Sequence, residues 1–123
     1  MKIIILNESK APDPLNNVEK RCAATPSSAQ RLVKKGATLL LEAGAGVHSG
    51  YSDKEYEDVG VTVIDDVNDA LSTADMLVAV NKPTDAQLAL MKKGAIVVGH
   101  LDPFFQQSLV ESIAEKGLTA ISV

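Results

Sequence analysis

Three polar residues of this sequence are candidates for binding a ligand: Arg21, Asn81 and His100. Arg21 stands just ahead of Thr25-Pro26, a pair that typically opens a helix, and a guanidinium beside free helix amides can bind a carboxylate or a phosphate through two hydrogen bonds. The imidazole of His100 could exchange a proton near neutral pH. Each residue also has a purely structural interpretation. Arg21 could be a surface arginine, Asn81 the polar end of a strand, and His100 a histidine bonded to a neighbouring loop. We therefore take the three as binding candidates and assign no catalytic residue.

Three charged residues accompany these candidates. Glu8 ends the first apolar run and could pair with Arg21, which would fix the long segment between them. Lys82 and Asp102 follow two later apolar runs, and Asp102 is expected to be the N-cap of a helix.

A glycine-rich stretch, Gly44–Gly50, resembles a dinucleotide-binding loop with one extra residue before its third glycine. Asp65 and Asp66 follow the next apolar run, where a ribose-binding acid would stand. In such a loop the backbone amides hold a pyrophosphate at the start of a helix. Here the helix starts only at Ser52, beyond the third glycine, so a plain glycine turn is the favoured interpretation.

Composition argues against several other functions. The net charge of -4 and the low aromatic content (3%) are unlike a nucleic-acid-binding protein. Cys22, the single cysteine, permits no internal disulfide and is interpreted as a small core residue. His48 and His100 lie in separate segments without metal-ligand spacing, so no metal site is expected.

Short apolar runs alternate with helix-like segments along the whole chain, which predicts an α/β fold: a three-layer parallel sheet with helices on both faces, flavodoxin-like or Rossmann-like. The predicted strands are Lys2–Leu6, Thr38–Glu42, Val61–Ile64, Met76–Val80, Ala95–Gly99 and Leu118–Val123. The predicted helices start at Thr25-Pro26, Ser52, Asp66, Thr84 and Asp102-Pro103. Carboxyl ends of parallel strands share one edge of the sheet, so the binding candidates should gather there.

Residues 1–123 read as a single domain, with one long irregular segment at residues 7–24. The first residues are too short an apolar run for a signal peptide, and no stretch approaches the ~20 apolar residues that cross a bilayer. We expect a cytoplasmic protein without direct membrane insertion.

Taken in order, the landmarks of the chain resemble the N-terminal domain shared by alanine dehydrogenase and the α subunit of nicotinamide nucleotide transhydrogenase, more closely the latter. The landmarks are Asn7-Glu8-Ser9-Lys10, Arg21-Cys22-Ala23-Ala24-Thr25-Pro26, Glu42-Ala43-Gly44-Ala45-Gly46, Asn81-Lys82-Pro83, Gly99-His100-Leu101 and Gly117-Leu118-Thr119-Ala120. The resemblance covers the whole chain, although the segment between Glu8 and Arg21 is longer than in either branch.

The resemblance implies what this domain does in a longer protein. It implies that NAD binds mainly to a separate Rossmann domain that follows in sequence, and that this chain alone binds no cofactor and is inactive. It also implies partners: that Rossmann domain, the membrane and NADP-binding subunits of a transhydrogenase, and a second copy in a homodimer. Which residues here contact NAD stays unknown.

The resemblance also bears on the choice between the two branches. Alanine dehydrogenases of this family hold pyruvate with an arginine, a lysine two residues before the proline that follows the fourth strand, and a histidine after the fifth. Arg21 matches the arginine, but Asn81 stands where the lysine would be, and His100 falls earlier than the histidine, with Asp102 nearer its position. A keto-acid site is therefore expected to be incomplete, which favours the transhydrogenase α subunit and hydride transfer between NAD(H) and NADP(H) coupled to proton translocation.

Three alternatives stay open from sequence. The chain could be the substrate domain of an alanine- or saccharopine-type amino-acid dehydrogenase. It could be a stand-alone binding module without turnover. It could also be a free dinucleotide-binding protein that uses Gly44–Gly50.

Overall fold

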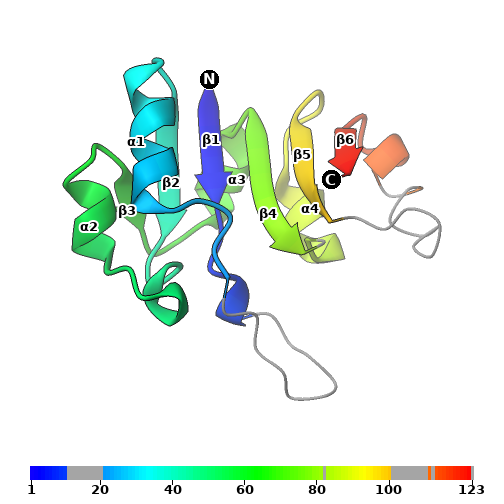
Figure 1. Cartoon of the computed structure of the whole chain (residues 1–123). Helices are drawn as coiled ribbons and strands as arrows, with labels where there is room; N and C mark the ends of the chain where they lie inside the picture. The colour runs from blue at the N-terminus through cyan, green and yellow to red at the C-terminus, as the bar shows by residue number, and fades with distance from the viewer. Residues whose placement is uncertain (11–20, 82, 101–110, 112, 123) are drawn as a thin grey trace.

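A six-stranded parallel sheet forms the centre of the molecule (Figure 1). The computed structural model describes residues 1–10, 21–81, 83–100, 111 and 113–122. The strands are β1 (Lys2–Ile5), β2 (Thr38–Glu42), β3 (Thr62–Ile64), β4 (Met76–Asn81), β5 (Ile96–His100) and β6 (Thr119–Ser122). Their order across the sheet is β3-β2-β1-β4-β5-β6, the doubly wound order of Rossmann folds. The predicted fold class is confirmed, and each predicted strand is found within a residue or so of its expected bounds.

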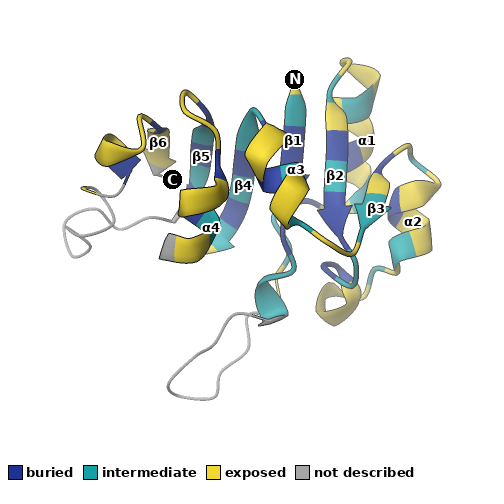
Figure 2. Ribbon diagram, turned by 180° about the vertical axis from the view of Figure 1, so that it is seen from behind, coloured by how far each residue is buried: buried dark blue, intermediate teal, exposed yellow. Residues whose placement is uncertain are grey.

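Helices cover both faces of this sheet. The helices are α1 (Pro26–Lys34), α2 (Asp53–Glu57), α3 (Asn68–Thr73) and α4 (Asp85–Leu90), with 3-10 turns η1 (Glu8–Lys10) and η2 (Val47–Ser49). Helices α1 and α2 lie on one face beside β2 and β3, and α3 and α4 lie on the other (Figures 1 and 2). Each strand of the centre therefore buries both of its faces, which explains why β1 is a continuous run of isoleucines (Ile3, Ile4 and Ile5) rather than an alternating pattern.

Local capping sets where the helices begin. Thr25 accepts a hydrogen bond from the Ser28 backbone amide at 3.2 Å, and the Ser28 side chain accepts one from the Thr25 amide at 2.9 Å, with Pro26 in the first turn. Ser52 and Thr84 cap α2 and α4 in the same reciprocal way. The helix starts predicted at these three positions are confirmed.

One predicted cap is wrong by a residue. Val67, not Asp66, is the N-cap of α3. Asp66 instead accepts a hydrogen bond from the Asn68 amide at 3.0 Å, closing a side-chain turn just ahead of the helix. The helix predicted at Asp102-Pro103 starts outside the described residues.

Strand β4 carries an irregularity near its carboxyl end. Val78 pairs with Val98, but the next pair along is Asn81 with His100, so β4 uses one more residue than β5 between the two pairs. This is the signature of a β-bulge. A Cβ atom at Gly99 would lie 2.9 Å from the Ala79 carbonyl oxygen, so the bulged strand approaches β5 at a residue without a side chain.

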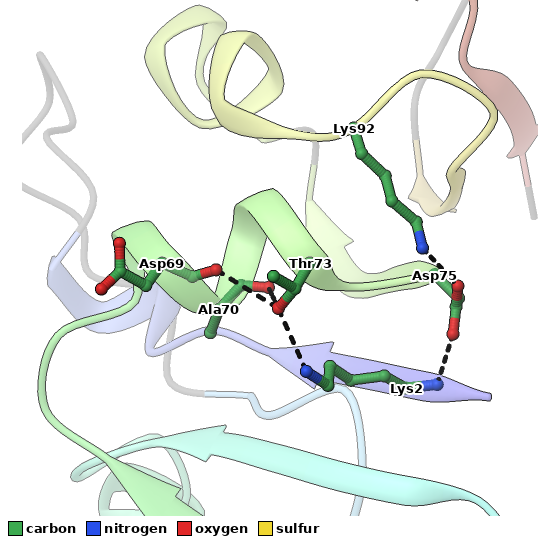
Figure 3. Close-up of polar contacts among 6 residues, drawn as sticks. All are labelled: Lys2, Asp69, Ala70, Thr73, Asp75 and Lys92. Atoms are coloured by element: carbon green, nitrogen blue, oxygen red, sulfur yellow. Dashed lines mark hydrogen bonds and ion pairs between the residues drawn. The ribbon is translucent and has the colours of Figure 1, made fainter.

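Hydrogen bonds to the Asp75 carboxylate stabilise the amino edge of the sheet (Figure 3). Asp75 accepts hydrogen bonds from the Lys2 backbone amide at 2.7 Å and from the Lys92 ammonium at 2.6 Å. These bonds lower the pKa of the Asp75 carboxyl from its ordinary value, chiefly through the Lys2 amide and then through Lys92. The cluster ties β1 to the loop before β5, at the end of the sheet away from the binding candidates.

Candidate functional site at the carboxyl edge of the sheet

The candidate site lies where β1 and β4 end side by side. From β1 the chain winds outward through β2 and β3 and then returns to β4 on the other side of β1. The loops after β1 and β4 consequently run in opposite directions, and parallel α/β sheets bind ligands at such a switch point.

Asn7 connects the end of β1 to β2. Its backbone amide donates to the Glu42 carboxylate at 2.7 Å, and its side-chain amide donates to the Ala43 carbonyl oxygen at 3.1 Å. Glu42 is 8% exposed, so this hydrogen bond is largely shielded from water and stabilises the turn out of β1. Ser9 donates to the Asn7 side-chain oxygen through its amide, at 3.1 Å, and through its hydroxyl.

Glu8 connects the end of β1 to β4 on the opposite side. One carboxylate oxygen accepts a hydrogen bond from the Val80 amide and the other from the Asn81 amide, both at 2.8 Å. Sequence reasoning considered only a pair of Glu8 with Arg21 and did not foresee these two bonds to β4. The bulge that aims two successive amides at one carboxylate leaves little trace in the sequence besides a glycine within β5.

Two of the predicted binding residues are brought together directly. Asn81 and His100 are partners across β4 and β5 at the carboxyl ends of both strands. Asn81 is exposed, and its backbone is fixed by Glu8. The side chain of His100, and all of Lys82 and Asp102, lie outside the described parts of the structure.

The described segment that enters α1 begins at Arg21. This segment passes beneath the arrowhead of β1 in Figure 1 and leaves Arg21 exposed. It is anchored at Ala24, whose carbonyl oxygen accepts a hydrogen bond from the Tyr56 hydroxyl at 2.7 Å. The Tyr56 ring is fully buried, and this burial, together with a hydrogen bond to the half-buried Cys22, raises the pKa of its hydroxyl. The Tyr56 ring also meets the Tyr51 ring edge to face, with the ring centroids 6.3 Å apart.

The glycine-rich stretch after β2 is built as a closed turn. The Gly44 amide donates to the Asp53 carboxylate at 2.9 Å. Further amides that donate to carbonyl oxygens of the same stretch or of Glu42 are those of Ala45, Val47, Ser49, Gly50 and Tyr51. Gly46 lies against the Tyr56 ring, where a Cβ would come within 2.6 Å of a ring carbon. Gly46 therefore serves packing, and the amides of the stretch bond within the turn, which agrees with the plain-turn interpretation. The turn also follows β2 rather than the strands at the switch point.

The histidine and the aspartates that follow β2 and β3 give little support for a metal site or a dinucleotide site. His48 is exposed on η2, and Asp65 and Asp66 are exposed after β3. Across the residues described, no group of histidine, cysteine, aspartate and glutamate side chains could hold a metal ion. Within the same residues, no helix combines the length and the apolar character needed to cross a membrane.

A doubly wound sheet with a polar switch point defines a broad class of nucleotide- and substrate-binding domains. Comparison with known proteins identifies the family within this class. A family model described as "Alanine dehydrogenase/PNT, N-terminal domain" matches residues 10–123. The chain belongs to this family.

Both branches of the family are represented among its relatives. The chain is 33% identical to "NAD(P) transhydrogenase subunit alpha" of Cereibacter sphaeroides, over 92% of this chain and 22% of the relative. It is 31% identical to "Alanine dehydrogenase" of Bacillus subtilis (strain 168), over 90% of this chain and 29% of the relative. A solved "L-alanine dehydrogenase" superimposes with a TM-score of 0.86 at 32% identity, covering 99% of this chain and 32% of the other. The chain thus spans no more than about a third of the length of these relatives.

Proposed function

We propose that this chain is the N-terminal domain of a transhydrogenase α subunit. In that role it supports hydride transfer between NAD(H) and NADP(H) coupled to proton translocation, and it is inactive alone. The cofactor supplies the hydride chemistry, while this domain orients the nicotinamide and excludes water. The domain would act at the cytoplasmic face of the membrane, together with its own NAD-binding Rossmann domain, the membrane and NADP-binding subunits, and a second copy in a homodimer.

The observation that carries this proposal is the residue type at position 81. In the alanine dehydrogenases that this chain resembles, a lysine stands at this position and supplies a cation that binds the keto-acid. Asn81 is neutral, although it sits beside the end of β5 at the switch point. An amide can accept or donate a hydrogen bond but cannot balance the charge of a carboxylate. Asn81 therefore suits the uncharged carboxamide group of a nicotinamide better than an amino acid's carboxylate.

Arg21 gives this proposal its first test. In the full-length protein with its partner subunits, we expect Arg21→Ala to reduce the rate of hydride transfer from NADPH to an NAD analogue by roughly 10-fold, the scale of one lost charge-assisted contact. Arg31→Ala is the matched control, since Arg31 is also exposed but lies in the last turn of α1. Equal rates for both variants and the wild type would remove Arg21 from the site.

A second candidate function is the substrate domain of an alanine- or saccharopine-type dehydrogenase. The similar identity to relatives of both branches favours keeping it, as does Arg21, which matches the substrate arginine of alanine dehydrogenases. The discriminating variant is Asn81→Lys, which restores a cation at the end of β4. If the transhydrogenase proposal holds, wild type does not oxidise L-alanine and this variant loses hydride exchange. Oxidation of L-alanine by the wild type would favour the second candidate.

A further inference from the structure

The last two residues of β4 have their amides aimed in one direction. In a regular strand, successive backbone amides point alternately to the two neighbouring strands. The amides of Val80 and Asn81 both donate to Glu8, one to each carboxylate oxygen, at 2.8 Å. The bulge between Val78 and Asn81 accounts for this change of direction.

Beyond the end of β1, the Glu8 side chain replaces that strand as the hydrogen-bond acceptor for β4. β1 pairs with β4 only from Ile3 to Ile5. Beyond this point the backbone of β1 turns away, and the amides of Val80 and Asn81 would otherwise lose their protein acceptor on that side. The two oxygens of the Glu8 carboxylate accept one of these bonds each.

On the other side of β4, β5 leaves room for the bulge. Gly99 lies against the Ala79 carbonyl oxygen, where an added Cβ would be 2.9 Å away, too close for a side chain. Glu8 and Gly99 thus enclose the bulge from opposite sides. Beyond it, Asn81 regains its pairing with His100.

From these contacts we propose that Glu8 is a positioning residue of the site: it holds the bulged end of β4 so that Asn81 stands in register with His100 at the sheet edge. This inference rests on the proposed function in one respect, since it takes Asn81 as part of the site. Glu8 acts through the backbone of β4 and needs no contact with the ligand.

Substitution of Glu8 by glutamine keeps the length of the side chain but removes its charge and one of its two acceptor oxygens. A glutamine has one acceptor oxygen and one NH2 group, so it can satisfy one of the two amides and faces the other with a donor. In Glu8→Gln we expect hydrogen exchange of one of the two amides, Val80 or Asn81, to be roughly 10-fold faster, and in Glu8→Ala that of both. The control is Glu57→Gln, which removes an exposed carboxylate at the end of α2.

The amide measurement uses the 123-residue chain and nuclear magnetic resonance. Faster exchange confined to the end of β4, with the amides of Leu39 and Leu41 in β2 unchanged, supports the proposal. Unchanged exchange at Val80 and Asn81 in Glu8→Ala overturns it. Faster exchange throughout the sheet also overturns it, because Glu8 would then support the whole fold rather than this strand end.

A kinetic cycle in the full-length protein tests whether positioning matters for the reaction. If Glu8 acts through Asn81, the double variant Glu8→Gln/Asn81→Ala loses no more kcat/KM than Asn81→Ala alone. Losses that simply add overturn the positioning role. A wild type without hydride exchange between the two nucleotides would contradict the proposed function only, since the amide measurement does not depend on that reaction.

Discussion

The hydroxyl of Tyr56 donates a hydrogen bond to the carbonyl oxygen of Ala24 at 2.7 Å, although the two residues lie 32 positions apart. This bond joins α2 to the segment that carries Arg21. The side chain of Tyr56 is fully buried, so both its ring and its hydroxyl contribute to how firmly that segment is held.

Removal of the Tyr56 hydroxyl should weaken the fold measurably. We expect Tyr56→Phe to lower the free energy of unfolding by about 1–2 kcal/mol, because the Ala24 carbonyl loses its donor. Tyr51→Phe serves as the control, since Tyr51 is only partly buried and contacts Tyr56 through its ring. Urea denaturation of both variants measures the difference. Equal stability of Tyr56→Phe and the wild type would contradict the anchoring role.

Gly99 offers a test of the β4 bulge. A methyl group at this position would lie 2.9 Å from a backbone oxygen that cannot move without shifting the strand. We expect Gly99→Ala to cost about 1–3 kcal/mol, the usual cost of overpacking. Gly36→Ala is the comparison: its φ of +97° is unfavourable for alanine, but nothing lies within 4 Å of the added methyl. Thermal denaturation measures the loss of stability in both variants, and amide spectra should show a perturbed β4 and β5 only in Gly99→Ala. An unperturbed spectrum there would argue against the bulge.

The lowered pKa of Asp75 predicts a dependence of stability on pH. A carboxyl whose pKa is lower in the folded than in the unfolded state stabilises the fold above its unfolded pKa, and this contribution is lost as the pH falls through the folded value. Asp75→Asn should therefore lower the melting temperature at neutral pH, with the difference from wild type shrinking below about pH 4. Asp58→Asn is the control, because Asp58 pairs with Lys54 at 3.8 Å in an exposed position. A difference for Asp75→Asn that stays constant down to about pH 2 would contradict this explanation.

The capping box at Thr25 links helix stability to the site. Thr25→Ala removes the acceptor for the Ser28 amide and should cost about 1 kcal/mol. Ser27→Ala, an exposed change within the first turn, should cost much less. If Arg21 depends on this helix start, Thr25→Ala also weakens any ligand contact of Arg21. Identical stability for the two variants, measured by chemical denaturation, would show that the cap contributes nothing.

Much of the fold could be predicted from sequence because its signals are local. From Ile3 onward strand β1 is an unbroken apolar run, which is typical of a strand buried on both faces. Thr25, Ser52 and Thr84 each indicate a helix start within three residues. The strand order, by contrast, depends on contacts between distant segments, and the alternation of strands and helices is equally compatible with a flavodoxin-like order.

The candidate site was less accessible to sequence reasoning because its key contacts are long-range. The spacing of Asn81 and His100 after consecutive strands correctly indicated a shared edge. The bonds from Val80 and Asn81 to Glu8 span more than 70 positions and depend on a bulge to which only Gly99 points in the sequence. Family resemblance placed Arg21 in a motif, but the tyrosine that anchors this motif comes from α2.

Hydride transfer by the full-length protein, assembled with the subunits that the proposed function implies, tests the central claim most directly. The measurement compares two rates in the same preparation: reduction of an NAD analogue by NADPH, and reduction of NAD by L-alanine. We predict nucleotide-to-nucleotide transfer that falls in Arg21→Ala, and no reaction with L-alanine. Reaction with L-alanine in the absence of transfer between the nucleotides would contradict the proposed function.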